Sequence, residues 1–167
     1  MDLLKQTDFK EEKNGAISYG GCLMMSLFAI PQLYLQKAFR KDEILFMYDH
    51  VIKRGYMKDG TPMETDDDKK NACWVLDHAS IANEGFSFLL HPELGVEYVG
   101  AFYVDEQKGT SWGVYHGDYL IIHGKTPLGH GHFELMEYDP YDPHIKLEEI
   151  YSIRYYRIGR RHGNGTR

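Results

Sequence analysis

Two glycines lead directly into a cysteine in the segment SYGGCLMMSLF, residues 18–28. An apolar, helix-like run begins at Cys22, so we expect this thiol at the N-terminus of a helix. A helix N-terminus carries partial positive charge and unpaired N–H groups, which favour a thiolate and can hold an oxyanion. Gly20 and Gly21 would leave room for a substrate backbone to approach. Cys22 is therefore a candidate nucleophile; the alternative is a small buried residue at a helix start.

A matching base is available in the segment GHGHFELMEYDPYDP, residues 129–143. His132 begins an apolar run after a glycine-rich turn, where an imidazole can face a cleft. Asp139 or Asp142 can accept the other ring N–H and fix the tautomer. A hairpin centred near Glu137 would bring Asp142 opposite His132, whereas Asp139 requires a turn that starts closer to the histidine. Both aspartates stay candidates, and a plain Asp-Pro turn is the alternative for this segment.

The same segment also matches a metal-binding pattern. From Gly124 the residues read G-x5-H-x-H-x4-E, which is the spacing of the first cupin metal motif. On a strand, His130 and His132 would point to one face, and Glu137 or His123 would complete a site for a transition metal. No second cupin half-motif follows. A metal-binding β-rich protein is therefore the second hypothesis.

Composition and charge limit the domain organisation, the partners and the location that we expect. The 167 residues are 43% hydrophobic and carry a net charge of −6, which predicts one globular domain over 1–167 and argues against nucleic acid as a partner. No long apolar run and no signal-peptide pattern occur, so we expect no membrane association and a cytoplasmic location. Cys22 and Cys73 are expected as free thiols, with Cys73 buried in a helix. Nothing in the sequence indicates an oligomeric state.

Helical patterns come first and strand patterns follow. The helical segments are 22–39, with Pro31 as a possible kink, 41–55, capped by Asp42, and 66–85. The strand segments are 96–104, 111–117, 118–124, 132–138 and 145–158. This order predicts an α+β fold with an antiparallel sheet packed against the first helix. We expect 1–15 to be a lead-in and 159–167 to be a flexible basic tail.

The order of these elements resembles the papain-like cysteine peptidase superfamily, nearest to the bacteriocin-processing (double-glycine) peptidases and phage-type relatives. The motifs that carry the resemblance are GGCLMMSL at the start of a long helix and GHGHF followed by Asp-Pro in the β-rich half. It implies Cys22 as nucleophile, His132 as general base, and Asp139 or Asp142 as orienting carboxylate. It also implies a peptidase or amidase without a cofactor. The implied substrates are peptide cross-links of peptidoglycan, as for a phage endolysin released by lysis, or a double-glycine leader.

The resemblance has one departure. Such peptidases place a Gln a few residues before the cysteine to complete the oxyanion hole, and here the corresponding positions hold Ala16 and Ile17. Asn14 or Tyr19 would have to donate instead. An inactive papain-like binding module is therefore the third hypothesis.

Overall fold

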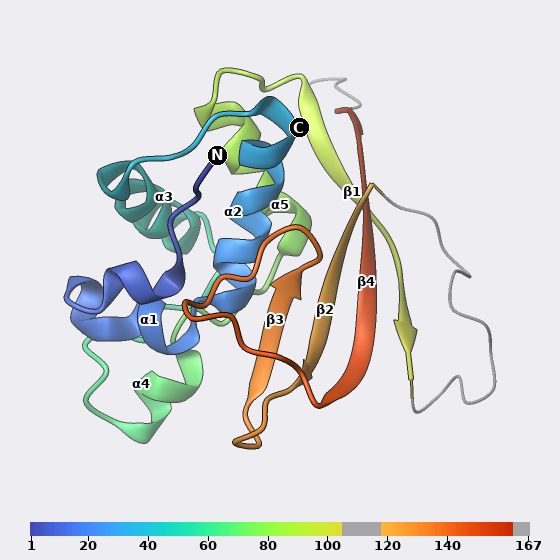
Figure 1. Cartoon of the computed structure of the whole chain (residues 1–167). Helices are drawn as coiled ribbons and strands as arrows, with labels where there is room; N and C mark the ends of the chain where they lie inside the picture. The colour runs from blue at the N-terminus through green and yellow to red at the C-terminus, as the bar shows by residue number, and fades with distance from the viewer. Residues whose placement is uncertain (105–117, 162–167) are drawn as a thin grey trace.

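The computed structural model describes residues 1–104 and 118–161, which form helices packed on one face of an antiparallel sheet (Figure 1). The helical elements are η1 (Gln6–Phe9), η2 (Glu12–Gly15), α1 (Ala16–Gly20), α2 (Cys22–Leu35), α3 (Lys41–Lys53), α4 (Asp66–Asn71) and α5 (His78–Phe88). The strands are β1 (Leu94–Tyr103), β2 (Tyr119–Lys125), β3 (Gly131–Leu135) and β4 (Glu149–Arg160). The expected α+β class is confirmed.

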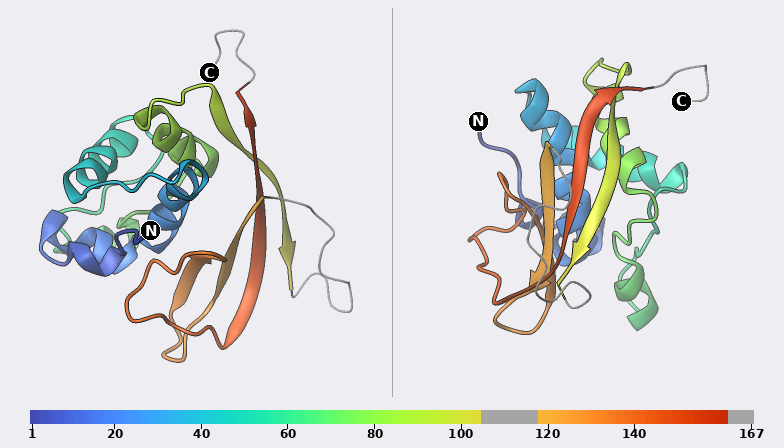
Figure 2. Two further views of the ribbon diagram at one scale, coloured as in Figure 1. Left: turned by 45° about the horizontal axis from the view of Figure 1, so that its top comes forward. Right: turned by 90° about the vertical axis from the view of Figure 1, so that its right-hand side faces the viewer.

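The sheet has the order β1-β4-β2-β3, and all its pairs are antiparallel. The long strand β4 therefore lies inside the sheet, and β3 forms one edge. Ile121 of β2 pairs with Leu135 of β3, and both side chains are buried in the hydrophobic core. Helix α2 contacts β3, and Figure 2 shows the helices together on one side of the strands. This packing brings the start of α2 to the edge strand that carries His132.

Helix α2 is the central helix of the domain. Every side chain from Leu23 to Gln32 is buried, so the helix has no face exposed to solvent over this stretch. Pro31 lies within it, and Gly85 of α5 packs so closely that a Cβ at Gly85 would lie 2.5 Å from the proline ring. The helix ends at Leu35 rather than near Phe39, because Gln36 takes the left-handed conformation that terminates helices. A helix surrounded by packed side chains is a rigid support for its first residue.

The prediction of one helix over 66–85 is wrong. Helix α4 ends at Asn71, and α5 begins at His78 and continues to Phe88. Between them, Cys73 has a φ of 53° and is buried, with its thiol 3.6 Å from the carbonyl oxygen of Ala16. The break arises from tertiary packing, because this stretch folds back against α1.

Two smaller predictions also need correction. Asp42 does not cap α3; the Glu43 carboxylate instead accepts a hydrogen bond from the backbone N–H of Arg40 at 2.8 Å. The segment 159–167 does not begin as a tail, because β4 extends to Arg160 and the Arg161 guanidinium donates to the carbonyl of Leu94 at 2.6 Å. The strand expected at 111–117 and the end of the tail lie outside the described residues.

Over residues 1–104 and 118–161, no single helix has the length and apolar character needed to cross a membrane. The pair Glu12–Gly20 and Cys22–Leu35 reaches that length and apolar character only when taken together, and it is bent by 86°.

Candidate active site

Cys22 is the first residue of α2, at the sharp bend between α1 and α2, and its side chain is half-buried. The glycines before it are required by packing within the chain itself. A Cβ at Gly20 would lie 2.4 Å from the carbonyl oxygen of Ala72, and a Cβ at Gly21 would lie 2.4 Å from that of Ile17. The two glycines thus allow the tight turn from α1 into α2 that leaves the thiol at the N-terminus of α2. The space that a side chain would need is filled by other backbone atoms of this protein.

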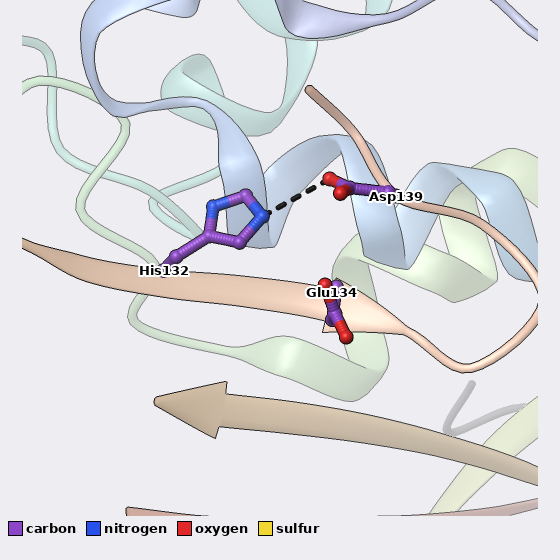
Figure 3. Close-up of side chains that lie close together, drawn as sticks. All are labelled: His132, Glu134 and Asp139. Carbon is purple, nitrogen blue, oxygen red and sulfur yellow. Dashed lines mark hydrogen bonds and ion pairs between the residues drawn. The ribbon is translucent and has the colours of Figure 1, made fainter. Parts of the chain in front are cut away.

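His132 lies on β3, and only 3% of the residue is exposed. Its Nε2 lies 3.0 Å from Oδ1 of Asp139. Figure 3 marks this contact with a dashed line, and Nδ1 is left as the ring nitrogen available to a second partner. Burial by itself would lower the pKa of His132, but hydrogen bonds to the Asp139 carboxylate and to the Cys22 thiol raise it to about 9. The ring therefore bonds Asp139, is influenced by Cys22, and holds its proton at neutral pH.

Asp139 is held by several donors in the loop that follows β3. Its carboxylate accepts the backbone N–H groups of Tyr141 at 2.9 Å and Ile145 at 3.0 Å, and Nδ1 of His144 lies 2.5 Å from its Oδ2. Burial raises the pKa of Asp139, but the hydrogen bonds from His132 and from these amides outweigh burial and lower it. The carboxylate is thereby kept charged and oriented toward His132.

Of the two candidate aspartates, the structure brings Asp139 to His132 and leaves Asp142 away from it. A tight turn explains the choice: the backbone groups of Leu135 and Tyr138 bond to each other at 2.9 and 3.0 Å, so the chain reverses immediately after β3. Asp142 is exposed, and its carboxylate accepts no hydrogen bond from a described residue.

The N-terminal segment is bonded to the loop that carries Asp139. The backbone N–H of Gln6 donates to the Pro140 carbonyl at 2.7 Å, and the Lys5 ammonium donates to the Asp139 carbonyl at 2.5 Å. The hydroxyl of Tyr138 donates to the Leu4 carbonyl at 2.5 Å. These bonds fasten the loop that carries the aspartate to the start of the chain.

Gln6 was missed by the sequence analysis because it lies far before Cys22 and has no motif around it. The residue is only 2% exposed, and its amide borders the same cleft as Cys22. Its Nε2 donates to the Ser18 carbonyl at 2.9 Å, whereas its Oε1 is buried without a partner among the described residues. Of the expected donors, Tyr19 borders the cleft, but Asn14 does not.

The predicted metal ligands are not brought together. Across the described ranges, the grouping with suitable donor atoms within 4.8 Å of one another consists of His132, Glu134 and Asp139, without His130 or Glu137. His123 instead stacks on Phe133 at 4.1 Å between ring centroids. Glu134 is drawn with His132 and Asp139 in Figure 3. Burial, followed by the charge of Asp139, raises the pKa of Glu134. The cupin-like ligand set is therefore not assembled, although a different His-Glu-Asp group is.

A cleft of about 1020 Å³ opens over Cys22 and His132. One wall comes from the segment 6–22 together with Met63, and the other comes from the segments 126–132 and 141–146. Comparisons of the chain with protein-family models, with curated proteins and with solved structures find no match. Three groups define what the cleft can do chemically: the thiol of Cys22, the protonated imidazole of His132 and the buried carboxylate of Asp139.

Proposed function

We propose that this protein is a papain-like cysteine hydrolase that cleaves peptide or amide bonds with Cys22, His132 and Asp139. The observation that carries the proposal is the buried ring of His132, which lies 3.0 Å from the Asp139 carboxylate and whose pKa is raised by that carboxylate and by Cys22. A nucleophile, a base and an orienting group in this sequence of contacts are what acyl transfer by a thiol requires.

The contacts support a two-step reaction. Once the Cys22 thiol has lost its proton to solvent, the protonated His132 stabilises the negative charge on the sulfur, which attacks the substrate carbonyl carbon and forms a tetrahedral oxyanion. As the C–N bond breaks, His132 gives its proton to the leaving amine, and an acyl thioester remains. His132 then removes a proton from water, the resulting hydroxide attacks the thioester, and the released sulfur regains its ionised form beside the imidazolium. Asp139 holds the ring orientation throughout.

The oxyanion would be held by the backbone N–H of Cys22 and by the side chain of Gln6. The amide nitrogen of Gln6 carries two hydrogens, and the Ser18 carbonyl accepts one of them; we assign the second to the oxyanion. Because Gln6 is buried and fixed by its bonds to Ser18 and Pro140, this donor is preorganised.

The resemblance to phage-type peptidases makes the peptide cross-links of bacterial peptidoglycan the first substrate class to test, and a double-glycine leader the second. Purified sacculi and a mixture of synthetic peptides would be incubated with the protein, and new amino termini would be identified by mass spectrometry. We expect cleavage by the wild type and by Cys73→Ala, which changes the other thiol, and none by Cys22→Ala or His132→Ala. Equal cleavage by Cys22→Ala would refute the proposal.

The group formed by His132, Glu134 and Asp139 supports a second candidate, a metal-binding protein. Metal analysis of the purified protein separates the two. One equivalent of a transition metal that His132→Ala and Glu134→Ala both remove would favour the metal site. An inactive binding module would show neither metal nor cleavage.

A further inference from the structure

The charge of the cleft lining differs from that of the whole protein. The chain carries a net charge of −6, yet no Asp or Glu lines the cleft over the catalytic pair. Apart from His132, its basic side chains are Lys10, His130, His144 and Lys146. A cleft lined by one sign of charge concentrates ligands of the opposite sign.

The two lysines stand on opposite walls. Lys10 follows η1 on the N-terminal wall, and Lys146 lies in the loop between Asp139 and β4. Both are exposed, and neither forms an ion pair with any residue of the described ranges. Their cations are thus available to a ligand, whereas the imidazole of His144 is already paired with Asp139.

Three acids lie within two residues of Lys10: Glu11 is exposed and does not line the cleft, and the other two are engaged with other groups. The carboxylate of Glu12 pairs with Lys41 at 2.6 Å, and that of Asp8 accepts the backbone N–H of Lys5 at 2.7 Å. Neither carboxylate lines the cleft, so neither cancels the charge of Lys10 there.

We propose that the cleft selects substrates that carry a carboxylate close to the bond that is cleaved, and that Lys10 and Lys146 are the residues that bind it. This inference rests on the proposed hydrolase function, since it names the substrate class of the same site. The apolar side chains of Met63, Pro127 and Ile145 line the remainder of the cleft and offer contacts to the uncharged part of such a substrate.

Two small alkylating reagents test the proposal. Iodoacetate and iodoacetamide both lose iodide to an attacking sulfur, but only iodoacetate carries a carboxylate. The rate constants at Cys22 would be measured for each reagent by mass spectrometry, with glutathione as the free-thiol standard. We expect the iodoacetate-to-iodoacetamide ratio at Cys22 to exceed that of glutathione and to fall with added salt.

Single and double variants then assign the effect. We expect Lys10→Gln and Lys146→Gln each to lower the ratio by about two- to threefold, the size of one screened unit charge, and the double variant to lower it further. Lys37→Gln is the matched control, because Lys37 is exposed and lies beyond the opposite end of α2 from Cys22.

The outcomes separate the two proposals. If the double variant keeps the wild-type ratio while iodoacetamide still reacts faster at Cys22 than at glutathione, the carboxylate proposal is overturned and the nucleophile stands. If iodoacetamide reacts no faster at Cys22 than at glutathione, the nucleophile itself is refuted. A fall in the ratio for Lys37→Gln equal to that for Lys10→Gln would also overturn the carboxylate proposal, because the effect would then be one of overall charge.

Discussion

Protonation of His132 should make the stability of the fold depend on pH. The pKa of this histidine is raised from 6.5 to about 9 in the folded chain. Between these values the folded state binds a proton that the unfolded state releases, so the free energy of unfolding must fall as the pH rises. The stabilisation is complete below pH 6.5 and is lost as the pH passes through 9. The difference between the two pKa values corresponds to about 3 kcal/mol.

Urea unfolding of the wild type and of His132→Gln measures this contribution. The free energy of unfolding would be compared between about pH 6 and about pH 9.5, with a reductant present. We expect the wild type to lose about 3 kcal/mol more than the variant over this interval. His91→Gln is the matched control, since His91 is a more exposed histidine that is paired with Glu93.

Other titrating groups do not produce the same signal. Burial, with the charge of Arg154, lowers the pKa of His78 and of His123 to about 4, so these rings change stability below pH 6.5 and act with the opposite sign. Burial raises the pKa of Cys73, but this thiol is present in both proteins and cancels in the comparison. If the wild type and His132→Gln show parallel curves, the catalytic pair takes up no net proton on folding, and the reasoning that His132 binds a proton while the Cys22 thiol keeps its own fails.

Three further substitutions and one treatment test the site, each by the rate of substrate cleavage. Cys22→Ser should abolish turnover and leave the Tm within a few degrees; unfolding of the variant would mean that the thiol serves packing. Asp139→Asn should lower kcat by at least about 100-fold, because the imidazolium loses its charged partner, and an unchanged kcat would exclude an orienting role. Gln6→Ala should lower kcat by about 100-fold with little change in KM; a change confined to KM would make Gln6 a substrate contact only. Dialysis against a chelator should leave the rate unchanged, whereas loss that zinc restores would favour the metal site.

The parts of the site that the sequence predicts are those encoded by local signals. Gly20 and Gly21 followed by an apolar run mark the helix start at Cys22, and a glycine-rich turn before a β-branched and aromatic run marks the strand that carries His132. These signals depend on residues adjacent in the chain. For that reason the helix start, the strand and the α+β class were all within reach of the sequence.

The remaining features depend on contacts between distant residues. The choice of Asp139 follows from the tight turn between Leu135 and Tyr138, and nothing in the sequence fixes where that turn begins. Gln6 reaches the cleft because the N-terminal segment is bonded to the loop after β3, a contact across more than 130 residues. The break near Cys73 likewise arises from packing against α1. No local pattern distinguishes these positions from ordinary surface or helical residues.

The central claim is that the sulfur of Cys22 is activated by the imidazole of His132. The rate constant for alkylation of Cys22 by iodoacetamide near neutral pH, measured in the wild type and in His132→Ala, tests it most directly. We expect the wild-type thiol to react at least about tenfold faster than that of the variant, and the buried Cys73 to remain unmodified in both. Equal rates for Cys22 in the two proteins would contradict the account.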